Sequence, residues 1–282
     1  MTYHSSPNIY VDFIHLKVED ITRALEFYGD IMGFGILERT EGMAVLTADG
    51  INPIIRLEQP KGVIPKIPRR TGLYHFAILL PEAKDLGIFL KHIRSKEYPI
   101  TGGANHGVSM AVYLEDPDDN GIEIYVDTHS SSWNWKEENI EMTNKPLDYN
   151  QLILDAGGAE WAGIPVNTII GHIHLHVADL KEAKEFYVDG LGFDLVMEMR
   201  DSALFLSSGG YHHHVGLNTW NGKGANPLPD NSVGMKYFSI MFPDNQERLN
   251  TIHKLKTLGY TTFEKKDKIF IKDPSLNLIQ LK

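Results

Sequence analysis

The chain of 282 residues contains an internal duplication, and no other feature constrains its fold as strongly. The segment Ile14–Asp20 returns 159 residues later as Ile173–Asp179. The pair Gly33-Phe34 returns as Gly192-Phe193 in the same register. A chance match would not hold its register over such a length. We therefore expect a fold built from two similar halves.

Each copy follows one order of predicted strands and helices. Residues 13–18 alternate around buried positions, as a strand does. Asp20 then offers a helix N-cap, and apolar residues recur with helical spacing as far as Gly33. Further strands are predicted at 35–39, 43–47, 53–57, 73–80, 110–114 and 121–126, with a second helix around 86–93. Each half thus consists of two strand–helix–strands units, which predicts an α+β fold of paired βαβββ modules.

These units predict two domains, at residues 8–128 and 168–282, joined by a linker at 129–167. The linker loses the periodicity of the repeats and exceeds a simple connection in length. It carries Trp133 and Trp135, and such large apolar rings indicate that it packs across a domain surface.

Composition narrows the range of functions. The chain has 27 basic and 37 acidic residues, a net charge of −10 and no basic cluster, so we expect no binding to nucleic acid or anionic membranes. Without an apolar stretch of about 18 residues or an export-type leader, we expect a cytoplasmic protein outside the membrane. Because the chain has 13 histidines and no cysteine, imidazole and carboxylate are the strong metal ligands left to it.

Three side chains of the first half are candidate metal ligands. His15 and His75 lie on the first strands of the two units, and Glu123 lies on the last strand of the second unit. A lone strand histidine is more often a core residue, and a lone glutamate usually faces solvent. If the two units form one curved sheet, however, all three side chains can point into a common cavity. Two imidazoles and one carboxylate form the facial triad of non-haem Fe(II) oxygenases.

Several motifs resemble the vicinal oxygen chelate superfamily, which includes glyoxalases, bleomycin resistance proteins and extradiol dioxygenases. They are Phe27-Tyr28, Gly33-Phe34 and the segment DPDDNGIEIY at 116–125, with their echoes in the second half. Within this superfamily the chain is similar to two-domain extradiol enzymes of the catechol 2,3-dioxygenase type. The resemblance implies two tandem vicinal-oxygen-chelate domains.

The same resemblance implies a reaction and roles for individual residues. We expect a metal-dependent, ring-cleaving dioxygenase that acts on catechol or a substituted catechol with O2. Fe(II), or else Mn(II), would bind His15, His75 and Glu123 of this chain. Tyr113 matches a family tyrosine near the substrate, and His106 lies close to a family histidine near the metal. The partners would be a small aromatic diol and dioxygen, in a homo-oligomer.

The second half departs from the family pattern. It keeps His174, but Tyr237 and Gln280 stand where the other two ligands should be. His213 matches the family's acid–base histidine. Two interpretations stay open: a vestigial pocket, or a second metal site that uses His174 and His214.

Two other functions also stay open. One is a glyoxalase-like isomerase or lyase on the same scaffold. The other is a protein that binds a metal or small molecule without turnover. The first half motivates this possibility, because its segment 52–56 has no histidine where the acid–base residue usually lies.

Overall fold

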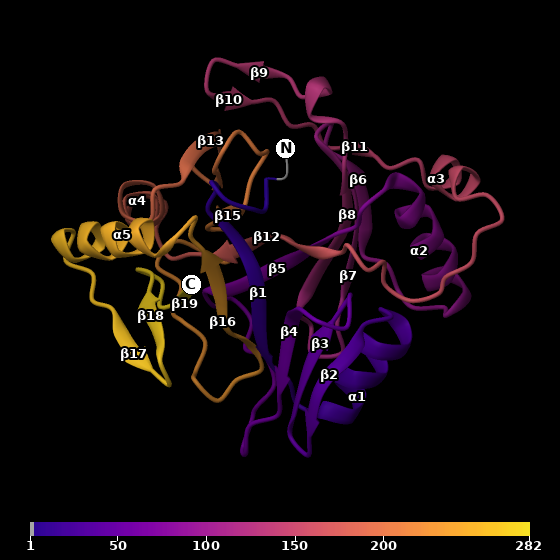
Figure 1. Ribbon diagram of the computed structural model, residues 1–282, viewed down its shortest axis with the longest axis horizontal. Coiled ribbons are helices and arrows are strands. Elements are labelled where there is room, and N and C mark those ends of the chain that lie inside the picture. The colour runs from indigo at the N-terminus through magenta and orange to yellow at the C-terminus, as the bar shows by residue number, and fades with distance from the viewer. Residues whose placement is uncertain (1–2) are drawn as a thin grey trace.

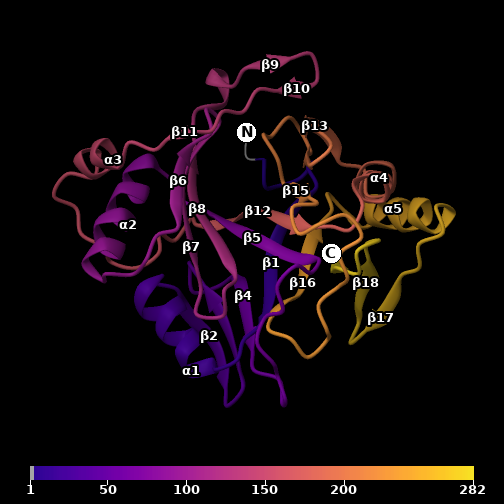
Figure 2. The same ribbon diagram turned by 180° about the vertical axis from the view of Figure 1, so that it is seen from behind.

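Two large β-sheets form the body of the protein, with helices on their outer sides (Figures 1 and 2). This architecture comes from a computed structural model that describes residues 3–282. Helices α1 to α3 lie on one side of the molecule and α4 and α5 on the opposite side. The predicted α+β fold of repeated modules is confirmed.

The first sheet has eight strands in the order β17-β18-β19-β16-β1-β4-β3-β2. Their bounds, in that order, are Phe263–Lys265, Lys268–Lys272, Leu278–Leu281, Gly234–Met241, Tyr10–Lys17, Pro53–Glu58, Met43–Thr47 and Gly35–Thr40. The second sheet has nine strands in the order β11-β6-β7-β8-β5-β12-β15-β14-β13. Their bounds are Lys145–Pro146, Gly102–Asn105, Ser109–Glu115, Gly121–Asp127, Gly72–Leu79, Ile169–His176, Val215–Asn218, Ala203–Ser207 and Asp194–Met199.

The two sheets do not follow the two halves of the sequence. We number the four modules in chain order, so that the first and second lie in the first half. Strand β1 of the first module pairs antiparallel with β16 of the fourth, and β5 of the second module pairs antiparallel with β12 of the third. The two units of residues 8–128 therefore do not form one curved sheet, so the condition under which the predicted ligands would share a cavity is not met. Each sheet takes one module from either half, and this exchange decides which histidines can meet.

The helix that follows the first strand begins and ends in the same way in both halves. Their bounds are α1 Ile21–Leu25, α2 Ala83–Ser95, α3 Tyr149–Asp155, α4 Leu180–Lys184 and α5 Asn245–Thr257, with a short 3-10 turn at Ser130–Ser132. Asp20 caps α1 and Asp179 caps α4, each by accepting two backbone N–H bonds. Both helices continue into a π-helical turn, η1 Glu26–Ile31 and η3 Glu185–Gly190. The single helix predicted at 21–33 is thus two consecutive segments, α1 and η1.

The linker packs against the body, as its indoles predict. Trp133 is buried, and its ring lies 5.3 Å from that of His212. A small hairpin of β9 (Trp135–Lys136) and β10 (Asn139–Ile140) follows, and β11 joins the edge of the second sheet. Among residues 3–282, no helix is both long and apolar enough to span a membrane.

Candidate metal centre

Two histidines and a glutamate converge in the second sheet. Nε2 of His75 lies 3.1 Å from Oε2 of Glu123, and Nε2 of His172 lies 3.3 Å from the same oxygen. The two Nε2 atoms are 3.4 Å apart. Within residues 3–282, this is the one group of histidine, aspartate or glutamate side chains whose ligand atoms lie close enough to hold a metal ion together.

The strand register explains why these three side chains meet. His172 on β12 and Glu123 on β8 both lie opposite Ala77 of the intervening strand β5. The small Ala77 side chain leaves space above the sheet for its two neighbours. His75 lies two residues before Ala77 and therefore on the same face. The three ligands thus come from three adjacent strands.

The trio is shielded from solvent. His75 is 6% exposed, Glu123 is 4% exposed and His172 is 1% exposed. Burial opposes ionisation of Glu123, but the imidazoles of His172 and His75 outweigh it and hold the pKa of Glu123 well below its usual range. Burial lowers the pKa of His172 to about 4 despite the nearby carboxylate. The centre therefore offers a carboxylate and a neutral imidazole, the protonation states that bind metals.

The expectation that His15 converges with His75 and Glu123 is wrong. His15 lies on β1 in the first sheet, where its Nε2 is 2.9 Å from Oε2 of Glu58. Its place in the trio belongs to His172, which is not among the predicted ligands. The duplication carried a signal for it, because the 159-residue offset aligns His172 with Phe13 and makes it an unmatched histidine.

The first sheet contains the corresponding positions without metal-binding side chains. Phe13 lies opposite Ser239, and Ser239 lies opposite Gln280, which repeats the arrangement of His172, Ala77 and Glu123. Tyr237 lies opposite His15 there, as His75 lies opposite His174 in the second sheet. Phe13 and Tyr237 form an apolar cluster with Phe270 that fills this place. The first sheet therefore lacks the ligand set that the second sheet carries at the same positions.

The alternative pair of the second half, His174 and His214, is not brought together. His174 packs beside the trio, with its ring 5.0 Å from that of His75. His214 is turned elsewhere: its Nδ1 accepts from the backbone N–H of Ser208, and its Nε2 bonds the carbonyl of Tyr3. Both nitrogens of His214 are thus used inside the protein.

The other predicted site residues lie around the trio. Tyr113 and His106 are joined by a hydrogen bond of 2.7 Å between the hydroxyl and Nε2. Burial and the neighbouring Glu123 raise the pKa of Tyr113, so its hydroxyl keeps its proton. The ring of His213 lies 4.1 Å from that of His172. The structure therefore brings His106, Tyr113 and His213 to one centre.

An inner cavity of about 320 Å³ opens beside these residues. This volume lies at the lower end of the range for small-molecule sites, roughly 300–1,000 Å³. Its apolar walls include Met142, Met197, Met199, Phe205 and Trp220. Met142 comes from the linker, which therefore helps to enclose the site.

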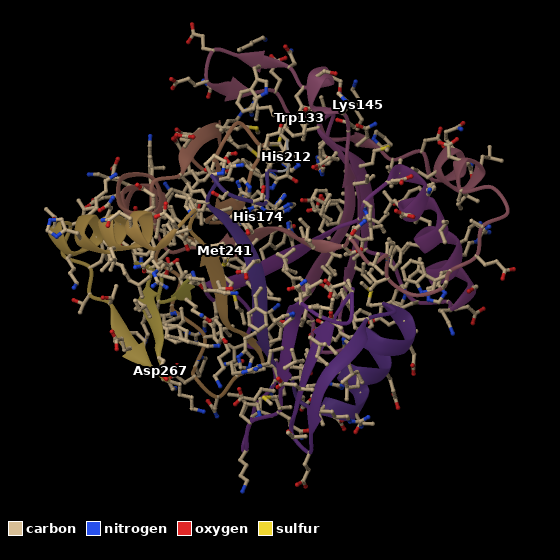
Figure 3. All side chains as sticks on the ribbon, in the orientation of Figure 1. Trp133, Lys145, His174, His212, Met241 and Asp267 are labelled. Carbon is tan, nitrogen blue, oxygen red and sulfur yellow. The ribbon has the colours of Figure 1, made fainter. Side chains whose placement is uncertain are left out.

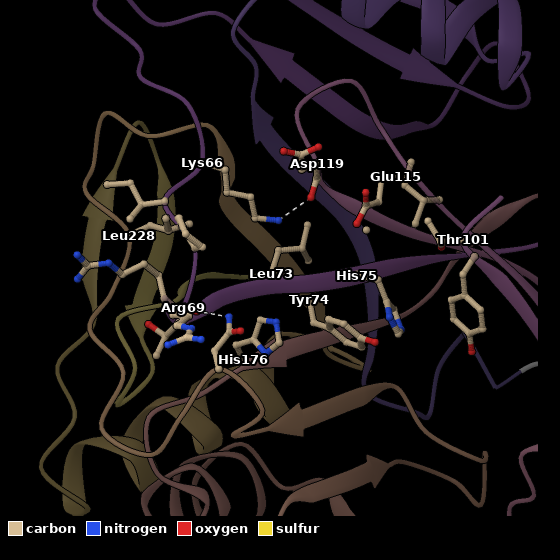
Figure 4. A pocket seen from close by; sticks show the side chains of 18 of the residues that line it. Lys66, Arg69, Leu73, Tyr74, His75, Thr101, Glu115, Asp119, His176 and Leu228 are labelled. Atoms are coloured by element: carbon tan, nitrogen blue, oxygen red, sulfur yellow. Dashed lines mark hydrogen bonds between the residues drawn. The ribbon is translucent and has the colours of Figure 1, made fainter. Parts of the chain in front are cut away.

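A larger and more polar cavity of about 860 Å³ adjoins the inner one (Figure 4). Tyr74, His75 and Tyr113 line both cavities. Lys66 lines the outer cavity, and Figure 4 shows its ammonium donating to the carbonyl of Asp119. The outer cavity therefore shares His75, a member of the trio, with the inner cavity.

The chain belongs to the Glyoxalase/Bleomycin resistance protein/Dioxygenase superfamily. The model of this family matches residues 10–124 and 169–281. The two matched stretches correspond to the duplicated halves, with the linker between them.

Individual relatives narrow the comparison. The chain is 44% identical to a catechol-2,3-dioxygenase of Bacillus subtilis (strain 168) over 270 residues, which covers 94% of each chain. It is 27% identical over 157 residues to biphenyl-2,3-diol 1,2-dioxygenase 3 of Rhodococcus globerulus, covering 53% of this chain and 81% of that one. A crystal structure of a Bacillus subtilis protein described as a dioxygenase shares the fold, with a TM-score of 0.65 at 14% identity, covering 98% of this chain and 86% of that one.

Proposed function

We propose that the protein is an extradiol ring-cleaving dioxygenase that acts on catechol or a substituted catechol with O2. The observation that carries this proposal is the buried trio of His75, Glu123 and His172, of which His75 and Glu123 line the apolar cavity. The identity of 44% to a catechol-2,3-dioxygenase supports the same reaction. The proposal places the enzyme in the cytoplasm as a homo-oligomer, and both of these features stay predictions.

The donor set fits a divalent transition metal. The three donor atoms are separated by 3.1, 3.3 and 3.4 Å. Neighbouring ligands of an octahedral ion with bonds of about 2.1 Å lie about 3.0 Å apart, so small shifts suffice to bind one. Two imidazoles and a carboxylate on one face are typical of Fe(II) oxygenases. We therefore propose Fe(II), or else Mn(II), on this trio.

When bound, the ion would lower the pKa of a diol hydroxyl and hold the diol beside dioxygen. The chain's own residues supply the remaining functions. Phe205 and Trp220 would hold the aromatic ring and exclude water from it. His213 would accept a proton from the diol at a ring nitrogen. Nδ1 of His106 donates to the carbonyl of Thr143, so its Nε2 accepts the proton of the Tyr113 hydroxyl. The oxygen of Tyr113 would then accept a hydrogen bond from a substrate hydroxyl.

The proposal is tested with two variants and a matched control. Glu123→Gln and His172→Gln each remove one donor, so we expect them to lose bound iron after anaerobic reconstitution and to lose the yellow ring-fission product from catechol. His15→Gln is the control, because His15 is as buried as the ligands but lies in the other sheet. We expect this variant to keep its iron and most of its turnover.

The opposite pattern, with iron lost from His15→Gln and kept in His172→Gln, would contradict the site. Consumption of O2 with catechol separates the proposed reaction from a glyoxalase-like isomerisation, which uses none. Catechol that binds the iron-loaded protein and survives exposure to air would instead identify a binding protein.

A further inference from the structure

A chain of hydrogen bonds connects the inner cavity with the protein surface. Nδ1 of His213 lies 2.8 Å from Nδ1 of His212. Nε2 of His212 lies 2.9 Å from Oδ1 of Asp127. His212 is fully buried, whereas the side chain of Asp127 is 25% exposed. His213 lines the cavity at the other end of the chain.

The protons in this chain can be assigned from the chemistry of each group. An ionised carboxylate only accepts hydrogen bonds, so Nε2 of His212 donates to Asp127. In its neutral form, His212 therefore carries its single proton at Nε2. Nδ1 of neutral His212 is then an acceptor, and Nδ1 of His213 must donate to it. This leaves Nε2 of His213 as the nitrogen with a free lone pair.

Neighbouring aromatic side chains hold this chain of hydrogen bonds in place. The ring of His212 lies 4.0 Å from that of Tyr211 and 5.3 Å from that of Trp133, and Figure 3 shows His212 and Trp133 close together. The hydroxyl of Tyr211 also donates to Oδ1 of Asp127, at 3.1 Å. Because Tyr211 has given its proton to Asp127, its oxygen accepts from Tyr125, at 2.7 Å. Two independent donors therefore orient the same carboxylate oxygen.

We propose that Asp127 and His212 are positioning residues that fix His213 as the Nδ1–H tautomer, so that its Nε2 faces the cavity as a proton acceptor. This inference rests on the proposed function for its consequence in turnover. The tautomer itself is a property of the folded chain and can be measured without metal or substrate.

The test is a ¹⁵N NMR measurement on metal-free protein labelled at histidine, with the His213 signals assigned from their absence in His213→Gln. We expect an unprotonated Nε2 and a protonated Nδ1 in the wild type. His212→Phe keeps an aromatic ring beside Tyr211 but removes the acceptor, so we expect His213 to shift toward the Nε2–H form. His212→Gln retains an acceptor for His213 and a donor for Asp127, and we expect it to keep the wild-type tautomer.

The same variants are then measured after loading with iron. We expect His212→Phe to lower kcat for catechol by about 10²-fold, with KM and iron content unchanged, because a general base contributes about that much. We expect His212→Gln to recover most of this loss. Asp127→Ala tests the end of the hydrogen-bond chain that faces solvent. It also replaces His212→Phe if that variant does not fold. Asp155→Ala, an exposed aspartate on α3, is the matched control without effect.

A protonated Nε2 in the wild type, or one tautomer shared by His212→Phe and the wild type, would overturn the inference. Wild-type protein that does not cleave catechol would contradict the proposed function instead, and would leave the measured tautomer intact. The two failures are therefore distinguishable.

Discussion

Acid is predicted to destabilise the metal-free protein, because folding buries several histidines in their neutral form. Burial lowers the pKa of His4 and of His172 to about 4, from the ordinary value of 6.5. Between these two pH values the unfolded chain binds protons that the folded chain refuses. The stability is therefore complete above pH 6.5 and falls as the pH falls toward 4.

The magnitude follows from the size of the shifts. Lowering the pH from 7.5 to 5 costs about 2 kcal/mol for each of His4 and His172, at about 1.4 kcal/mol per pH unit below 6.5. Burial also lowers the pKa of His174, His213 and His214 well below 6.5, and these act in the same direction. The buried Asp273 opposes them, because burial raises its pKa to about 6 and its protonation favours the folded state by about 1.4 kcal/mol at pH 5.

Urea unfolding of metal-free protein, followed by tryptophan fluorescence at pH 7.5, 6.5, 5.5 and 5, measures this effect. We expect the free energy of unfolding to decrease by about 3 kcal/mol or more over the series. In His172→Gln the decrease should be smaller by about 2 kcal/mol, because one of the titrating groups is gone. A free energy of unfolding that stays constant or rises from pH 7.5 to 5 would refute the reasoning.

Two further predictions concern the packing that supports the site. In Gly216→Ala the new Cβ would lie 2.8 Å from the ring of His174, so we expect a loss of about 1–3 kcal/mol in a thermal melt, whereas Gly102→Ala, with open space around its Cβ, should lose much less. Tyr187→Phe removes the hydroxyl that donates to buried Asp273 at 3.0 Å, and we expect it to cost about 1–3 kcal/mol; a variant as stable as the wild type would contradict this role.

The sequence predicts the modules well and their pairing poorly. Helical spacing and alternation locate segments such as Met43–Thr47 within a residue or so, because each pattern arises within its own segment. The short strand β6 at Gly102–Asn105 was missed, since two of its four residues are glycine and give no apolar alternation. The partner of each module is a long-range choice. Strands β1 and β5 are both largely apolar eight-residue segments that contain one histidine. Nothing in their own residues therefore shows that β5 pairs with β12.

The candidate site was predicted in part for the same reason. His75 and Glu123 belong to one module, and their convergence needs only the local strand order of β5 and β8. The third ligand depends on which module adjoins β5, and assuming the first module pointed to His15. Once β12 takes that place, the register opposite Ala77 selects His172. Pairing β5 with the wrong module therefore changes the predicted third ligand from His172 to His15.

The position of the metal tests the central claim most directly. Crystals grown anaerobically with Fe(II) would give an anomalous difference map at the iron edge. The structure predicts one strong peak within bonding distance of Nε2 of His75, Oε2 of Glu123 and Nε2 of His172. A peak beside His15, or a map without a peak at the trio in iron-loaded active protein, would contradict it.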